Sequence, residues 1–255
     1  MKHWSEFARM LDEAADNASA IAPLADTASL TVEEAYAIQA ASIARRHARG
    51  DTRAGVKVSL TSRIAMRHGD SPEIVFGWIT EAMRLAEGSD LSLSSYLRPQ
   101  VQPGIAYIMG QPLRSGTSAA EASAAIAAIA PALEIVDSRY GTAEYSLQDM
   151  IVDNACAAGF VLGGFSKSCA NIENLGVLLD INGRTAQIGS TAAILGNPIR
   201  ALLATACALE RTGGSLQSGD IVLISGATPA HPLMPGDYVC ATTEALGRVA
   251  LHITP

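Results

Sequence analysis

The segment Gly55-Val56-Lys57-Val58-Ser59-Leu60 is the first clear β-strand in a chain that begins with helices, and it therefore indicates a fold that contains both. Its apolar residues alternate with Lys57 and Ser59, which is the two-residue period of a strand. One face of the strand is therefore apolar, and the other carries an ammonium group and a hydroxyl. This polar face is a candidate wall of a functional site.

Upstream of this strand the pattern is helical. Phe7, Met10, Leu11 and Ala14 recur at helical spacing near the N-terminus. A second helix is expected to begin after Thr31, because Thr31 and Glu34 have the spacing of a capping box. We therefore predict an N-terminal helical subdomain over residues 1–50 and a main domain over residues 51–255.

Downstream, predicted strands alternate with predicted helices. The strands are expected at 101–109, 131–137, 176–183, 220–225, 237–242 and 248–253. The helices are expected at 78–86, 118–130, 149–161 and 194–211. The closing run of Gly- and Pro-punctuated strands looks antiparallel. The order predicts an α+β fold built on a mixed β-sheet.

Composition excludes several classes of protein. Hydrophobic residues make up 49% of the chain and charged residues 17%, which is typical of a globular protein. A net charge of -7 and the lack of a Lys/Arg run argue against nucleic acid as a partner. The N-terminus lacks the apolar core of a signal peptide, and the Ala-rich stretch 119–132 is too short to span a membrane. Four widely spaced cysteines indicate reduced thiols, and we expect a cytoplasmic protein.

Several sequence blocks, in order along the chain, resemble one known family. The blocks are Ala35-Tyr36-Ala37-Ile38-Gln39, Gly55-Val56-Lys57-Val58-Ser59-Leu60-Thr61-Ser62, Phe76-Gly77, Leu133-Glu134-Ile135-Val136-Asp137-Ser138-Arg139, Asp153-Asn154-Ala155, Leu195-Gly196-Asn197-Pro198 and Gly219-Asp220-Ile221-Val222-Leu223-Ile224-Ser225-Gly226. Together they resemble the 2-keto-4-pentenoate hydratase/4-oxalocrotonate decarboxylase family of the fumarylacetoacetate hydrolase superfamily. The resemblance implies a long curved sheet that folds round on itself, an N-terminal helical subdomain and a homo-oligomer.

The resemblance also implies a chemistry. Family members add water to, or remove carbon dioxide from, small unsaturated 2-oxo acids late in the meta-cleavage breakdown of aromatic compounds. A divalent ion, usually Mg²⁺ or Mn²⁺, chelates the substrate, and a Glu-x-Glu pair with a third Glu holds the ion. Here Gln102 and Gly104 occupy the positions of the pair, and only Glu134 remains. One carboxylate is a poor site for Mg²⁺. No cofactor is therefore expected, and Mg²⁺ or Mn²⁺ is disfavoured unless Glu134 and Gln102 hold an ion weakly through water.

Three residues are predicted to be catalytic, each with a plainer alternative. Lys57 matches the family lysine and would be the cation facing a carboxylate or 2-oxygen; otherwise it is a strand-edge lysine reaching solvent. Glu134 would be a pocket carboxylate or half of a buried structural pair. His231, in a loop, would be a proton shuttle, although the sequence shows no partner for it.

A second group is predicted to bind the substrate: Ser59, Thr61, Gln102, Asp137 and Cys156. The two hydroxyls would bind a carboxylate or cap the following turn. Alternation sends Asp137 to the face opposite Glu134, so it would instead orient Arg139 or cap the strand. Cys156 lies in an Ala-rich neighbourhood that fits a core residue better than a nucleophile.

The predicted function is that of a lyase-like enzyme of the hydratase/decarboxylase type, acting on a 2-hydroxy- or 2-amino-dienoate without a metal ion. One alternative is a hydrolytic deaminase or tautomerase of a 2-aminomuconate or 2-hydroxymuconate type of substrate. Another is a non-catalytic partner subunit or a carboxylate-binding homologue. The expected partners are a small carboxylate substrate and further copies of the chain, with a complex with another enzyme of the same pathway as an alternative.

Overall fold

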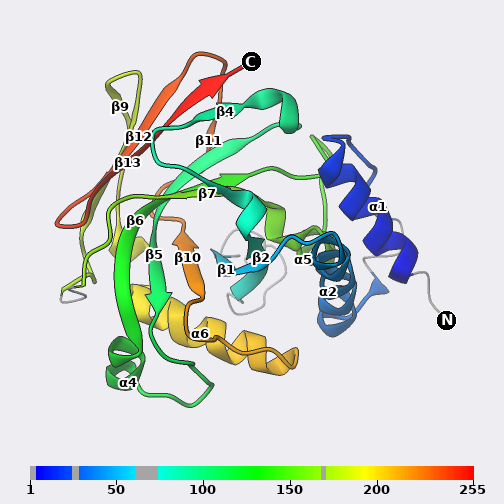
Figure 1. Cartoon of the computed structure of the whole chain (residues 1–255), viewed down its shortest axis with the longest axis horizontal. Coiled ribbons are helices and arrows are strands. Elements are labelled where there is room, and N and C mark those ends of the chain that lie inside the picture. Colours follow the sequence, from blue (N-terminus) through cyan, green and yellow to red (C-terminus); the bar gives the residue numbers. More distant parts are fainter. Residues whose placement is uncertain (1–3, 25–28, 61–73, 168–170) are drawn as a thin grey trace.

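The computed structural model describes residues 4–24, 29–60, 74–167 and 171–255. Two helices, α1 (Trp4–Asp16) and α2 (Val32–Ala48), lie side by side at one flank of a β-rich body (Figure 1). The predicted capping box of α2 is confirmed, because Thr31 and Glu34 each accept a hydrogen bond from the other's backbone N–H. The helical N-terminal region is thus present, while the boundary at residue 50 stays a prediction. Side chains of α2 such as Ile38 join the core of the body.

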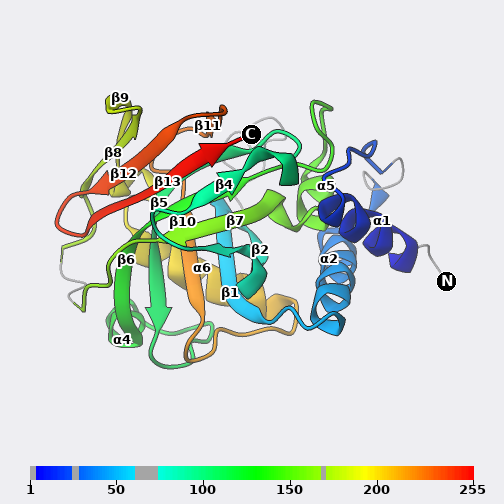
Figure 2. The same ribbon diagram turned by 45° about the horizontal axis from the view of Figure 1, so that its top comes forward.

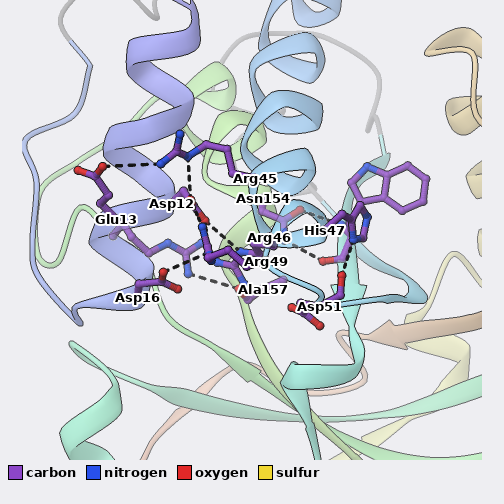
Figure 3. Close-up of polar contacts among 12 residues, drawn as sticks. Asp12, Glu13, Asp16, Arg45, Arg46, His47, Arg49, Asp51, Asn154 and Ala157 are labelled. Carbon is purple, nitrogen blue, oxygen red and sulfur yellow. Dashed lines mark hydrogen bonds and ion pairs between the residues drawn. The ribbon is translucent and has the colours of Figure 1, made fainter.

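A cluster of ion pairs fastens α1 to α2 (Figure 3). Asp12 of α1 is fully buried and accepts hydrogen bonds from Arg45 at 2.8 Å and from Arg49 at 2.6 and 2.8 Å. Burial opposes ionisation of this carboxyl, but the hydrogen bonds from Arg49 and Arg45 outweigh burial, so the pKa of Asp12 is lowered. The charged form of Asp12 therefore helps to hold α1 in place.

The body consists of two β-sheets, counted over the described residues. The larger, sheet A, has the order β2-β1-β10-β5-β6-β7-β3, and β11 also pairs with β5. Its strands are β1 (Arg53–Leu60), β2 (Ile74–Thr80), β3 (Arg84–Leu85), β5 (Gln100–Met109), β6 (Ile126–Val136), β7 (Ala157–Leu162), β10 (Ile221–Ser225) and β11 (His231–Pro232). The smaller, sheet B, contains β4 (Asp90–Ser92), β8 (Gly176–Ile181), β9 (Arg184–Ser190), β12 (Tyr238–Thr243) and β13 (Gly247–Thr254). Parallel β1–β10 pairing amid antiparallel neighbours makes sheet A mixed, as predicted.

Sheet A curls, so that β2 and β7 touch although they are not paired neighbours. Its outer face is covered by helix α6 (Pro198–Arg211) and by sheet B, as Figure 2 shows. Val56, Val222 and Ile105 point to this outer face and share the main core. Residues one step along each strand therefore point into the hollow of the sheet. The remaining short helices are α4 (Ala119–Ala124), α5 (Leu147–Val152) and 3₁₀ turns at Glu81–Met83, Leu93–Ser95, Asn154–Cys156 and Thr191–Ala193.

By length and composition alone, the segment Thr191–Arg211 would pass for a membrane-crossing helix. Half of its apolar window is buried in the fold, where the apolar face of α6 packs on sheet A. A core helix of a soluble protein has the same composition. This segment is therefore explained by the core that it joins.

Three helix predictions were wrong. Trp78 lies in strand β2, the helix predicted at 118–130 ends at Ala124, and the helix predicted at 149–161 ends at Val152. In the second case, Ala128 and Ala130 pair with β5, so strand pairing overrides the helix propensity of alanine. In the third, the turn at Asn154–Cys156 redirects the chain into β7.

Candidate functional site

Lys57 and Glu134 meet inside the hollow of sheet A. Lys57 comes from β1 and Glu134 from β6, with β10 and β5 between them. Three steps between strands would separate them by about 14 Å on a flat sheet. The curl of the sheet closes this gap, and the Lys57 ammonium forms an ion pair with Oε1 of Glu134. The two side chains are only 2% and 1% exposed, so the pair is shielded from water.

Ser225 and Gln102 complete the polar cluster. The hydroxyl of Ser225, at the end of β10, donates to Oε2 of Glu134. Oε1 of Gln102, which is the Cα partner of Glu134 across the β5–β6 ladder, lies 3.3 Å from the same hydroxyl. The amide of Gln102 donates to the carbonyl of Thr228 at 3.4 Å. Both oxygens of Glu134 therefore have protein partners.

Among the described residues, Glu134 is the one ion-pair partner of Lys57. An ammonium group carries three donors, so further N–H groups of Lys57 can bind a ligand oxygen. Gln102 is less buried than the other members of the cluster and marks the side from which a ligand would approach. The cluster can therefore present a positive donor to a negative oxygen in a dry environment, where electrostatic interactions are strong.

A cavity of ≈ 520 Å³ lies next to this cluster. Gln100 and Val136, which are Cα partners, line the cavity, and the next pair on the same face is Gln102 with Glu134. Two residues of strand cover about 7 Å. The cavity thus begins one side-chain layer away from the polar cluster.

Two of the predicted substrate-binding residues also line this cavity. Both oxygens of Asp137 accept backbone N–H groups at 2.8 Å, from Leu97 and from Arg98. Asp137 therefore anchors this segment, while Arg139 is held by Asp153. The thiol of Cys156 is buried and lies 3.8 Å from the hydroxyl of Tyr145.

The thiol of Cys156 is neutral at physiological pH. Burial and the charge of Asp153 raise the pKa of Cys156 to about 11, although the nearby charges of Arg139 and Lys57 act in the opposite direction. The pKa of Tyr145 is raised as well, by Cys156 and by burial. The pair is therefore a neutral wall of the cavity, and Cys156 is not an activated nucleophile.

A strained turn places Cys156. Asn154, Ala155 and Cys156 have φ values of 53°, 52° and 58°, which is the left-handed region that residues with a Cβ avoid. The amide of Asn154 holds the turn, because it exchanges hydrogen bonds of 2.7 and 2.8 Å with the backbone of Trp78. A Cβ at Gly77 would overlap the carbonyl of Asn154, so only glycine fits there. Such strain costs about 1–3 kcal/mol per residue and is concentrated at functional sites.

The residues present do not fit a magnesium site. Gly104 carries no side chain, and a Cβ there would overlap the carbonyl of Ile224 and come within 2.9 Å of the Cα of Ser225. The carboxylate of Glu134 is already bound by Lys57 and Ser225. Within the described part of the chain, no three His, Cys, Asp or Glu side chains converge as metal ligands. Hard ions such as Mg²⁺ prefer several oxygen ligands in octahedral geometry, and this cluster offers one carboxylate and one amide.

The other predicted residues lie outside the cluster. Ser59 is partly exposed and lies on the same strand face as Lys57, two residues along. Thr61 lies outside the described residues. His231 is the Cα partner of Val101, whose side chain packs in the core between the two sheets. The structure therefore does not bring His231 to Lys57, because paired residues point to the same face.

The sequence analysis did not identify two polar residues that lie in the cluster or in the cavity. Ser225 ends an otherwise apolar strand, and Arg98 lies in the loop before β5 and lines the cavity. The polar end of an apolar strand was the available signal for Ser225. Arg98 showed no comparable signal.

Comparisons with known proteins agree with this fold. Residues 55–254 match the family model described as fumarylacetoacetate (FAA) hydrolase C-terminal. The chain therefore belongs to the fumarylacetoacetate hydrolase family, and the predicted fold is confirmed.

Within that family, its relatives are hydratases and decarboxylases, as the sequence blocks predicted. The chain is 39% identical to a 4-oxalocrotonate decarboxylase of Pseudomonas sp. over 98% of each chain. It is 30% identical to a 2-keto-4-pentenoate hydratase of Paraburkholderia xenovorans strain LB400, over 96% of this chain and 92% of that one. The 4-oxalocrotonate decarboxylase from Pseudomonas putida G7, complexed with magnesium and adipate, matches with a TM-score of 0.93 and 26% identity over 98% of this chain and 97% of that one. That enzyme was also solved with calcium and acetate.

Proposed function

We propose that this protein is a lyase of the hydratase/decarboxylase type, acting on a small unsaturated 2-oxo acid from the meta-cleavage breakdown of aromatic compounds. We further propose that the Lys57 ammonium does the electrostatic work that a divalent ion does in metal-dependent relatives. The observation that carries the proposal is the buried Lys57–Glu134 pair, with Ser225 and Gln102, in the hollow of the curled sheet. The relatives named as decarboxylase and hydratase support the reaction class.

The proposed chemistry depends on charge that develops on the 2-oxygen. In the decarboxylation of an unsaturated 2-oxo dicarboxylate, the C–C bond to the distal carboxylate breaks and its electron pair moves along the conjugated chain to the 2-oxygen. Carbon dioxide leaves, and the dienolate oxygen takes a proton from Lys57 to give the 2-hydroxydienoate. A preorganised cation aimed at such an oxygen in a dry site is among the largest contributions an enzyme can make.

Glu134 has a positioning role in this scheme. Its carboxylate faces the Lys57 ammonium and holds this side chain in place in the absence of substrate. Ser225 fixes the second carboxylate oxygen and so fixes the direction of the ion pair. Lys57 recovers its proton from water after the product leaves.

A second candidate is the deamination or tautomerisation of a 2-aminomuconate or 2-hydroxymuconate type of substrate. The specific observation that favours it is the loss of the metal ligands at positions 102 and 104, since imine hydrolysis and proton shifts need less Lewis acid. The same Lys57 and Glu134 would move the proton. A non-catalytic homologue, by contrast, would turn over neither class of substrate.

The test is turnover of 2-hydroxypentadienoate, 4-oxalocrotonate and 2-aminomuconate by the purified protein, in EDTA and with added Mg²⁺ or Mn²⁺. We expect one substrate to be converted equally well in EDTA and with metal, and Lys57→Met to abolish that conversion. Turnover that requires added metal would refute the role proposed for Lys57. Absence of any turnover would favour the non-catalytic alternative. Gel filtration of the same sample tests the homo-oligomer, which stays a prediction, as does the cytoplasmic location.

A further inference from the structure

The cavity next to the polar cluster contains a cation that the proposed chemistry does not use. Arg98 lines this cavity, and among the described residues its guanidinium has no carboxylate partner. A guanidinium group presents a planar fork of donors that matches a carboxylate in a bidentate arrangement. An open arginine in a cavity is therefore a candidate anion site.

The backbone that carries Arg98 is held in place from within the cavity wall. Asp137 is buried and accepts the N–H groups of both Leu97 and Arg98 at 2.8 Å. The carbonyl of Pro99 accepts the N–H of Leu233 at 3.1 Å from the other side. These bonds position the start of β5, so that the Arg98 side chain extends from a fixed point.

Distance along the strand separates Arg98 from Lys57. The pair Gln102–Glu134 lies beside the ammonium, the pair Gln100–Val136 is about 7 Å further along, and Arg98 lies two residues beyond that. A carboxylate bound at the Lys57 end therefore cannot also reach Arg98. The guanidinium requires a second carboxylate at the far end of a carbon chain.

The cavity that Arg98 lines also has apolar side chains. These are Leu93, Leu97, Val136, Leu233 and Met234. Apolar side chains near a cation are complementary to a hydrocarbon segment that ends in a carboxylate.

We infer that Arg98 binds the distal carboxylate of the substrate, so that the site selects an unsaturated 2-oxo dicarboxylate over the monocarboxylate of the same length. Arg98 is then a specificity-determining residue, and Asp137 is its positioning residue. The inference rests on the proposed function, because it takes the Lys57 cluster as the place where the 2-oxo acid end binds.

The test compares two unreactive probes that differ only at the far end, 2-oxoadipate and 2-oxohexanoate, by calorimetry in EDTA. Both probes lack the conjugated double bond, so binding is measured without turnover. For the unmodified protein we expect 2-oxoadipate to bind about 10–100-fold more tightly, which is the range of a charge-assisted hydrogen-bonded pair. Arg98→Gln should bind both probes with the weaker affinity, and Arg98→Lys should keep part of the preference.

A matched control is Arg114→Gln, since Arg114 is also exposed but does not line this cavity. This variant should bind both probes like the unmodified protein. Equal affinity of the unmodified protein for the two probes, or an unchanged preference in Arg98→Gln, would overturn the inference. If the two cations form separate sites, Lys57→Met should bind neither probe, whereas Arg98→Gln should bind both probes without a preference. A protein that binds 2-oxoadipate selectively but turns over no dienoate would refute the proposed function and leave the role of Arg98 standing.

Discussion

Replacing Lys57 with methionine leaves a carboxylate buried without its counter-charge. Because the two side chains are only 2% and 1% exposed, water screens the interaction little. Removing one partner of such a pair typically costs 3–5 kcal/mol. The unfolding free energy of Lys57→Met should therefore lie about 3–5 kcal/mol below that of the unmodified protein at pH 7.

The reverse single variant, Glu134→Gln, leaves the Lys57 ammonium buried without its counter-charge. It should therefore lose a similar amount of stability. The double variant Lys57→Met/Glu134→Gln should recover most of the lost stability, because no buried charge remains.

The assay is equilibrium unfolding in urea at pH 7 and at fixed protein concentration, for the unmodified protein and the three variants. Deficits below about 1 kcal/mol in the single variants, which is the behaviour of exposed pairs, would refute a dry Lys57–Glu134 pair. A double variant that is no more stable than the single variants would refute the view that each charge compensates the other.

Three further outcomes follow from the structure. Gly104→Glu should lower the melting temperature without creating a tight Mg²⁺ site in calorimetry, because even the Cβ overlaps the backbone of Ile224. The control Gly164→Ala should leave the melting temperature unchanged, because a Cβ there meets open space. Submicromolar Mg²⁺ binding by Gly104→Glu would contradict the argument that the site does not fit this ion. Asp12→Asn should cost about 1–3 kcal/mol, whereas Glu13→Gln in an exposed pair should cost less than about 1 kcal/mol. Because the pKa of Asp12 is lowered in the folded protein, its contribution to stability is present above the ordinary aspartate pKa of 3.8 and is lost as the pH falls further. Asp12→Asn should therefore flatten the acid side of the stability curve, and parallel curves for the two proteins would count against this. Cys156→Ala should keep turnover within a few-fold of the unmodified protein. In the unmodified protein at pH 7, iodoacetamide should alkylate the exposed Cys207 but not Cys156, which mass spectrometry can check. Rapid alkylation of Cys156 would show an ionised thiol.

Much of the local structure could be predicted from local patterns. The capping box at Thr31 and the strand period around Lys57 depend on residues a few positions apart, and both were predicted correctly. The helix predicted after Asp149 failed because Ala-rich segments suit a helix and a buried strand equally well. Pairing with β6 made residues 157–162 a strand, and that pairing is a long-range contact.

The candidate site was only partly predictable for the same reason. Lys57 and Glu134 were identified separately, but their ion pair depends on the strand order and on the curl of sheet A. The strand register of sheet A brings Ser225 into the cluster and places His231 on a different face of the sheet. A one-residue change in register would reverse both outcomes.

The family and the absence of the acidic pair can be read from residue identities, because the residues at positions 102 and 104 do not depend on how the chain folds. The same holds for the alternation that gives β1 a polar face. The ion pair between the Lys57 ammonium and Glu134, and the place of Arg98 in a nearby cavity, depend on the folded chain. Such contacts join strands far apart in the chain, and their distances are set by sheet order, register and curl, which local periodicity does not encode.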